Sequence, residues 1–362
     1  MINKNLARRI YHGVRSRIHD RSRRAGDRLK VTYQRLRLGL SKTFQQHQRR
    51  LKHLASNQRS ISEGGEQKLK EAVQRLWFDP HPLREMFDEQ ERAACWNALL
   101  FQRLDNTRRR YVPWLDSVSH LAGARILEIG CGSGPASVAF LEQGASVVGA
   151  DVNEEHIELG RIRLGLYGFD KPEFINILND EFNALSAGSF DWVIFMASLE
   201  HMYLEERLTL LRKADQLLKP GGFLAVVECP NRLWHEDTHT SWMPFFNWIR
   251  DETAFQYGTQ SKRSFVRGLG LSGNAASYDL FIREGRGASF HDIQLALGAD
   301  FGGYEVLSSL GGYEEACNPL HRSGRNKDDV WYAEFIASKA PHIHKGFFED
   351  YLNIVMRKPS SA

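Results

Sequence analysis

Acidic and imidazole side chains that could remove a proton gather in two stretches of this 362-residue chain. Glu200 and His201 stand together in SLEHM, whereas His235 and His239 flank two acids in WHEDTHT. An imidazole or a carboxylate within hydrogen-bonding reach of a hydroxyl group can take its proton while the oxygen attacks an electrophile. We therefore predict that these two histidine-containing stretches supply the catalytic residues, namely His201, Glu200, His235 and His239.

Other interpretations of these side chains stay open. His201 could shape the pocket without acting as the base. The stretch from Cys229 to Trp248 could bind a divalent metal, since imidazole and carboxylate groups are suitable ligands. It could also be a structural loop, or it could grip a polar substrate by stacking Trp234 or Trp242 on a sugar. We prefer substrate contact and include no metal in the predicted site.

A further histidine, His291, follows in GASFHDIQLALG. Ser289 and Asp292 beside it have the spacing of a capping box, in which a side chain at each position satisfies a backbone N–H of the other. This pattern favours a structural helix start over a role in chemistry.

A glycine-rich loop precedes all of these residues. In EIGCGSG, Glu128 is followed by Gly130, Gly132 and Gly134, and Asp151 ends the next predicted strand. Glycine permits unusual backbone angles and lets a ligand approach the main chain closely. A carboxylate at the end of the second strand can accept hydrogen bonds from both ribose hydroxyls. The sequence thus predicts a ligand that contains adenosine.

Dinucleotide binding is the competing interpretation of this loop, and it fits less well. Its pattern requires a third glycine at the position of Pro135. It also benefits from a helix N-terminus that is free to hold a pyrophosphate. Glu128 instead places a negative charge just before the loop, which suits a cationic ligand such as a sulfonium that carries an amino acid.

These residues resemble the first two motifs of class I S-adenosylmethionine-dependent methyltransferases, acid-x-Gly-x-Gly-x-Gly followed by an acid on the next strand. Three later segments agree with the family pattern: NDEF, SFDWVIFMASLEHM and LLKPGG. The resemblance covers about half of the chain, roughly residues 112–229 and the last strands. It implies S-adenosyl-L-methionine as the cofactor and an α/β fold, Rossmann-like, with a seven-stranded, mostly parallel sheet.

The resemblance also implies which residues contact the cofactor. Asp180 would lie near the adenine, although the neighbouring Asn179 leaves that register open by one residue. The Leu-Glu-His segment at 199–201 is frequent among family members that act on small molecules, sugars and quinones. The full set of implied cofactor-binding residues is Glu128, Gly130, Gly132, Gly134, Asp151, Asp180 and Met196.

Strands that alternate with helices must position these residues, which predicts a parallel sheet. We expect helices at about 89–104, 135–143, 154–167 and 204–218. We expect strands at Arg125–Ile129, Ser146–Asp151, Glu173–Leu178, Phe190–Phe195, Gly222–Cys229, Trp331–Ile336 and Tyr351–Met356.

The first part of the chain differs from the rest in charge. Residues 1–60 hold 17 Lys and Arg against two acids, and apolar residues recur there at helical spacing. A basic amphipathic arm suits an anionic membrane surface. Packing against a partner or another copy, nucleic-acid binding and organelle targeting are the alternatives.

We divide the chain into this arm at 1–60, a helical lid segment at 61–115 and a methyltransferase domain at 116–362, with an insertion at about 230–325. Four scattered cysteines indicate neither disulfides nor a cysteine-based zinc site, which favours a reducing, cytoplasmic compartment. The arm could place the protein at the inner face of the membrane. A homo-oligomer is compatible with the sequence.

The sequence therefore predicts an O-methyltransferase that acts on a small molecule, a glycan or a lipid-linked saccharide. The stretch from Cys229 to Trp248 also resembles a block of bacterial methyltransferases from surface-polysaccharide gene clusters. The alternatives are an RNA or DNA methyltransferase that uses the basic arm, and a cofactor-binding scaffold without activity. Nucleic-acid enzymes that methylate amino groups carry an NPPY-type signature after the fourth strand, with a planar amide and a stacking aromatic residue. MASL, at that position here, has neither, which argues against a nucleic-acid substrate.

Overall fold

The computed structural model describes residues 42–170, 172–317 and 326–360. Its centre is a seven-stranded sheet with the strand order β3-β2-β1-β4-β5-β7-β6. Only β7 runs antiparallel to its neighbours, β5 and β6. The strands are β1 Arg125–Ile129, β2 Ser146–Asp151, β3 Glu173–Asn176, β4 Phe190–Met196, β5 Leu218–Pro230, β6 Glu305–Ser309 and β7 Tyr351–Arg357. This is the Rossmann-like, mostly parallel sheet that the sequence predicts.

Six of the seven predicted strands are confirmed, and one is wrong. The run Trp331–Ile336 lies in helix α17, Lys327–Lys339, and the sixth strand is β6, inside the predicted insertion. The aromatic and β-branched residues of that run favour a strand. Local signals favour a helix, because the Asn326 side chain caps it and Asp328 and Asp329 occupy its first turn.

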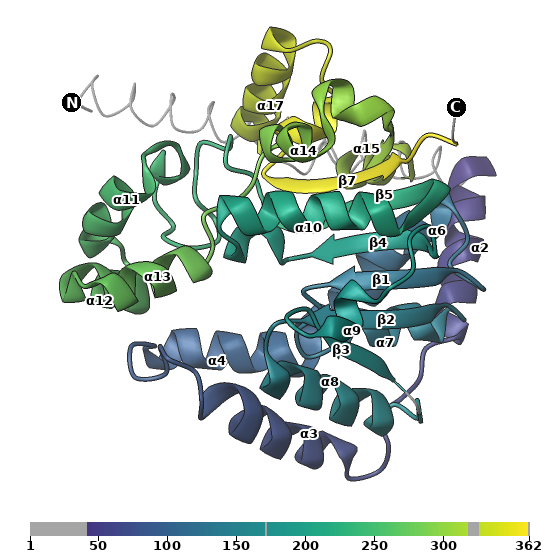
Figure 1. The fold of residues 1–362 in the computed structure, drawn as a ribbon, viewed down its shortest axis with the longest axis horizontal. Coiled ribbons are helices and arrows are strands. Elements are labelled where there is room, and N and C mark those ends of the chain that lie inside the picture. The colour runs from purple at the N-terminus through teal and green to yellow at the C-terminus, as the bar shows by residue number, and fades with distance from the viewer. Residues whose placement is uncertain (1–41, 171, 318–325, 361–362) are drawn as a thin grey trace, which may run out of the picture.

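Helices cover both faces of the sheet (Figure 1). The central strands are buried on both faces, as in other parallel sheets. Ile126 and Leu127 alternate between two apolar clusters, so that consecutive residues of β1 belong to different layers. The three helices predicted beside these strands are confirmed within about one residue, as α7 Pro135–Glu142, α8 Glu154–Leu166 and α10 Leu204–Leu217.

The residues before β1 are helical, and residues 1–41 of the predicted arm lie outside the described residues. Helix α2, Lys42–Ser56, buries Leu54 in one of the two apolar layers of the sheet. The helix predicted to start at Glu89 does so, with a capping box at Asp88, and it continues to Val118. The elements are α3 Gly65–Val73, η1 Gln74–Phe78, α4 Glu89–Asn97, η2 Ala98–Gln102, α5 Arg103–Asn106, η3 Thr107–Tyr111 and α6 Val112–Val118.

Between β5 and β6, residues 246–283 form a helical unit beyond the carboxyl ends of β1 and β4, whereas residues 290–297 pack against α10 (Figure 1). Its phenylalanines, among them Phe246 and Phe281, share an apolar cluster with Leu83 and Phe87 from before the sheet. The helices are α11 Asp251–Tyr257, α12 Ser264–Ser272, α13 Ala275–Arg283 and α14 Phe290–Leu297, and the short α9 Asp180–Asn183 and α15 Leu310–Cys317 lie elsewhere. Among the described residues, no helix combines the length and apolar character needed to cross a bilayer.

Candidate cofactor and active site

The loop between β1 and α7 has the backbone that its glycines allow. Gly130, Gly132 and Gly134 have φ angles of 76°, 51° and 74°, a region that residues with a side chain rarely adopt. The Gly130 N–H donates to the carbonyl of Ala150, 2.7 Å away, and so fixes the loop to the end of β2.

The three glycines differ in what surrounds them. A Cβ at Gly130 would lie 2.4 Å from the Ser198 Cβ, and one at Gly134 would crowd Leu164 and Phe174. A Cβ at Gly132 would meet no atom within 4 Å. Gly130 and Gly134 therefore serve packing, whereas Gly132 leaves an open approach to the main chain for a ligand.

Two buried carboxylates lie beside this loop. Asp151 accepts hydrogen bonds from the N–H groups of Gly132, at 2.8 Å, and Asn153, at 3.0 Å. Glu128 is 2% exposed and accepts only from the Ser137 hydroxyl, at 2.5 Å, among the described residues. Burial raises the pKa of Glu128 to about 8, an effect that Ser137 opposes and the Asp151 charge adds to. A ligand with a positive charge would stabilise the ionised forms of both carboxylates.

Apolar side chains that the sequence analysis did not consider stand at the ends of β2 and β3. Val152, which directly follows β2, is 55% exposed. Leu178, in the turn after β3, is 75% exposed. Exposed apolar side chains at these two strand ends can contact an aromatic base. Asp180, predicted to lie near the adenine, is exposed at the start of α9 in the same region.

Arg163, on α8, is a second residue that sequence reasoning missed. Its side chain is fully buried and donates to the carbonyls of Ser133, in the glycine loop, and Leu99, in the segment before the sheet, at 2.7 and 2.8 Å. Its Nη1 atom has no hydrogen-bond partner among the described residues. Arg163 thus ties the predicted lid segment to the glycine loop. An arginine within a helical pattern carries no local signal of this role.

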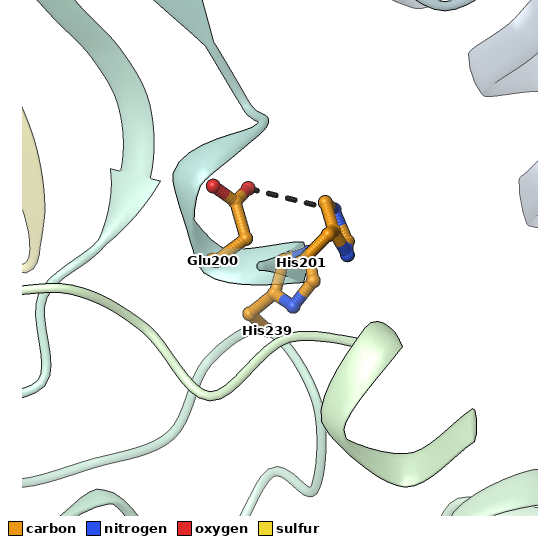
Figure 2. Close-up of side chains that lie close together, drawn as sticks. All are labelled: Glu200, His201 and His239. Atoms are coloured by element: carbon orange, nitrogen blue, oxygen red, sulfur yellow. Dashed lines mark ion pairs between the residues drawn. The ribbon is translucent and has the colours of Figure 1, made fainter. Parts of the chain in front are cut away.

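Three of the four predicted catalytic residues come together at the end of β4. Glu200 and His201 belong to the short helix η4, Leu199–His201, and His239 reaches them from the insertion (Figure 2). One ligand atom from each side chain lies within 4.8 Å of the other two. The Ser198 hydroxyl donates to the carbonyl of Ile129, 3.0 Å away, which holds this cluster next to the glycine loop.

The charge state of the cluster follows from burial. Glu200 is fully buried, and burial raises its pKa to about 8. Burial lowers the pKa of His201 to about 4 and that of His239 to about 3. The His201 side chain is 39% exposed, so a ligand can reach it. Both imidazoles are therefore neutral at neutral pH.

His235, the fourth predicted catalytic residue, lies apart from this cluster. Its Nε2 atom is 3.3 Å from the Asp329 carboxylate on α17, and its ring packs against Trp234 and Tyr332. The intervening Asp237 is buried and accepts hydrogen bonds from three backbone N–H groups of its own loop. His235 and His239 hence do not form a joint site, because the turn around Asp237 points them in different directions.

The remaining predicted residues have simple positions. Met196 ends β4, and its sulfur is 3.9 Å from the Thr107 hydroxyl of the preceding helical segment. The capping box of Ser289 and Asp292 is confirmed, and His291 is exposed beside it. Ala197 and Glu228, at the ends of β4 and β5, have positive φ angles of 46° and 56°. Such backbone strain is frequent at functional sites.

The donor set fits S-adenosylmethionine. Open space lies beside Gly132, and Asp151 presents carboxylate oxygens. A positive charge on the ligand would stabilise the ionised form of Glu128. Val152 and Leu178 present apolar surface. The cluster of Glu200, His201 and His239 lies at the adjoining strand end, where a second molecule could meet the cofactor. This placement follows the rule that open α/β sheets bind ligands at the carboxyl ends of their strands.

Comparisons with known proteins agree with this assignment. A family model described as "Methyltransferase domain" matches residues 127–224. A ubiquinone biosynthesis O-methyltransferase of Burkholderia vietnamiensis is 30% identical over 218 residues, which are 59% of this chain and 89% of that protein. One of Aromatoleum aromaticum is 34% identical over 122 residues, 34% of this chain, and the match spans about half of that protein, 51%.

Two solved structures are similar over more than half of the chain. A magnesium protoporphyrin IX methyltransferase of Synechocystis with bound SAH is 18% identical, with a TM-score of 0.36, and the match covers 57% of this chain and 75% of that one. An S-adenosylmethionine dependent methyltransferase of Mesorhizobium loti is 16% identical, with a TM-score of 0.36, covering 68% and 96%.

Proposed function

Because the chain belongs to the class I S-adenosylmethionine-dependent methyltransferase family, we propose that it methylates a hydroxyl oxygen of a small molecule. The cofactor supplies an electrophilic methyl group on a sulfonium. The protein must then hold the acceptor oxygen in line with that methyl group and stabilise the oxygen as it loses its proton.

The residues of the glycine loop hold the cofactor. The Gly132 backbone leaves room for the main chain to approach it, and Asp151 accepts hydrogen bonds from its ribose. Glu128 carries the charge that complements its amino-acid part. Arg163 keeps the Ser133 carbonyl and the helical segment before the sheet in place around these contacts.

The cluster of Glu200, His201 and His239 is the observation that carries the proposal for an oxygen acceptor. A hydroxyl group must give up its proton on methylation, which requires lone pairs or a charge close to the oxygen. The two neutral imidazoles provide such lone pairs next to the cofactor loop. The names of the relatives, O-methyltransferases, support the same chemistry.

The experiment is a methyl-transfer assay with purified protein, cofactor labelled in its methyl group, and pairs of acceptors that differ only in hydroxyl or amino substitution. We expect label in a methyl ether, identified by mass and by the chemical shift of its methyl protons. Transfer to the amino members alone would contradict the proposal. Loss of cofactor binding in Asp151→Ala, measured by calorimetry, would check the cofactor site independently.

A glycan or lipid-linked saccharide is the finer proposal for the acceptor. Three aromatic side chains of the insertion, Trp242, Phe245 and Trp248, are each about half exposed, at 51%, 53% and 51%. Exposed aromatic rings suit sugar faces and membrane interfaces. The assay repeated on cell extract, separated into lipid, glycan and soluble fractions, tests this acceptor and the peripheral membrane location together. Label in nucleic acid alone would replace both with the RNA or DNA alternative.

A further inference from the structure

We propose that Glu200, His201 and His239 bind one divalent transition-metal ion, in a site that the β4 loop and the insertion build together. The side chains face a common point from two segments that are distant in sequence (Figure 2). The His201 Nε2 atom and the Glu200 Oε1 atom are 3.7 Å apart, and all three ligand atoms lie within 4.8 Å of one another.

The Glu200 carboxylate lacks the hydrogen-bond partner or positive charge that a buried carboxylate requires. It has no solvent exposure, and neither of its oxygens has a hydrogen-bond partner among the described residues. Burial of a carboxylate without partners is strongly unfavourable, so such groups are normally paired or coordinate a metal. The nearby Cys229 thiol is only a weak donor. A cation between Glu200 and the histidines would provide the missing partner.

The hydrogen bonds of the two Nδ1 atoms leave the Nε2 atom of each neutral histidine unprotonated. The His201 Nδ1 atom is 2.6 Å from the carbonyl oxygen of Arg283, which can only accept, so Nδ1 carries the proton. The His239 Nδ1 atom is 3.1 Å from the Thr240 hydroxyl, whose own proton goes to the Gly285 carbonyl, 2.5 Å away. Outer hydrogen bonds of this kind fix the tautomer and ring orientation of metal-binding histidines.

The backbone of the insertion leaves space for this arrangement. Gly285 has a φ of 106°, and a Cβ there would lie 3.0 Å from the His239 ring and 3.4 Å from the Glu200 Cγ. The Arg286 N–H donates to the Glu200 carbonyl, 3.1 Å away. A positive φ and a missing side chain at one position thus let His239 reach Glu200, while a backbone bond holds the two segments together.

Two imidazoles and one carboxylate select the class of ion. Zn²⁺, Co²⁺ and Fe²⁺ accept this mixed set, whereas Mg²⁺ and Ca²⁺ prefer oxygen ligands. Bonds of about 2.0–2.1 Å at tetrahedral angles separate ligand atoms by about 3.3 Å, so small side-chain rotations close the present spacing. Three protein ligands leave a position open, as in catalytic rather than structural sites.

The open position gives the ion a role, and that role rests on the proposed function. An acceptor hydroxyl placed there would have a lowered pKa, and its proton would pass to solvent. The oxygen then forms its bond to the methyl carbon as the carbon–sulfur bond breaks, which gives a methyl ether, S-adenosylhomocysteine and one released proton. The binding of the ion itself requires neither cofactor nor acceptor.

The test is a titration of the purified full-length protein, stripped with a chelator, with Co²⁺ and then Zn²⁺. Visible absorption and calorimetry follow binding in the absence of cofactor and acceptor. We expect one ion per chain, with the absorption of a four- or five-coordinate Co²⁺ site that Zn²⁺ displaces. His239→Ala and Glu200→Gln should weaken binding by about 100-fold or more.

Matched variants distinguish the loss of a metal ligand from a general loss of folding. His120→Ala, a histidine whose side chain is 81% exposed at the end of α6, should bind the ion as the wild type does. Thr240→Val removes the acceptor of the His239 Nδ1 proton together with the hydroxyl donor to the Gly285 carbonyl, and should weaken binding by about 10–100-fold. Circular dichroism confirms that each variant is folded.

The proposal fails if the wild type shows no saturable binding of either ion, or if folded His239→Ala and Glu200→Gln variants keep its affinity. Metal binding without methyl transfer to any hydroxyl would leave the site standing and remove the proposed function. Methyl transfer at the full rate by protein stripped of metal would leave the proposed function standing and remove the catalytic role of the ion.

Discussion

His201, at the end of β4, and His239, in the insertion, face each other with ring centres 5.5 Å apart and planes at 63°. Each ring has its Nδ1 atom in a hydrogen bond with the surrounding protein, which leaves both Nε2 atoms for a third partner. We therefore propose that the insertion contributes a side chain to the chemistry in addition to covering the acceptor. Its removal or displacement should affect catalysis before it affects cofactor binding.

Loss of the His239 imidazole tests this relationship. We expect His239→Ala to lower kcat for methyl transfer by about 10²–10⁴-fold, the usual contribution of a group that assists proton removal. The cofactor Kd should stay within about twofold of the wild type, since the glycine loop and Asp151 are untouched. Steady-state kinetics and calorimetry measure the two quantities. A large change in cofactor Kd with unaltered kcat would place His239 in the cofactor site instead.

Two glycines with positive φ allow the effect of backbone strain to be distinguished from the effect of a steric contact with His239. Gly285 has a φ of 106° and faces the His239 ring, whereas Gly273 has a φ of 64° and an added Cβ there would meet no atom within 4 Å. Alanine at either position should cost about 1–2 kcal/mol of unfolding free energy. Only Gly285→Ala should also reduce methyl transfer, by about 100-fold, because it displaces His239. Equal activity of the two variants would show that the His239 position is unimportant.

Cofactor binding should release a proton near neutral pH. Burial raises the pKa of Glu128 to about 8, so the carboxyl is mostly protonated at pH 7 without ligand. A cationic ligand beside it favours the ionised form, so affinity should rise as pH increases from about 6 to about 8. Calorimetry in buffers of different ionisation enthalpy counts the released proton. Glu128→Gln should abolish the release, and its persistence in that variant would assign it to another group.

The same pKa affects stability of the ligand-free protein. The folded-state pKa of Glu128 lies above the unfolded value of 4.5, so the folded state binds the proton more tightly. This contribution to stability is fully present below the unfolded pKa and is lost as pH rises through about 8. Chemical unfolding of wild type and Glu128→Gln over this range should show a smaller alkaline loss in the variant.

Arg163 should position the cofactor loop from outside the ligand contacts. Arg163→Met removes the donors to Ser133 and Leu99, which should lower stability by about 1–3 kcal/mol and raise the cofactor Kd by about tenfold. Arg161→Met, on the same helix α8, removes one bond to the Phe174 carbonyl and is the matched control. If both variants bind the cofactor as the wild type does, Arg163 acts on folding alone.

Much of the fold followed from local pattern. The strand and helix bounds around Gly130 and Asp151 were predictable because buried parallel strands and their flanking helices have distinct periodicities. The segment Trp331–Ile336 was misassigned, since its aromatic residues favour a strand while its capping signals lie outside the run. The true sixth strand, Glu305–Ser309, is short and only partly buried, so its composition gives a weak strand signal. Its hydrogen bonds with β7 stabilise it as a strand.

The sequence by itself determined the backbone of the glycine loop, because Gly130, Gly132 and Gly134 stand after a buried strand whose bounds local spacing encodes. It also placed Glu200 and His201 together, because they are adjacent in the chain. Only the tertiary structure decided that His239 joins them while His235 does not, and that Arg163 links two distant carbonyls. The first relationship depends on how the insertion folds back over the sheet, and the second on how the helical segment before the sheet packs against α8. Such contacts between distant segments leave no periodic trace in the sequence.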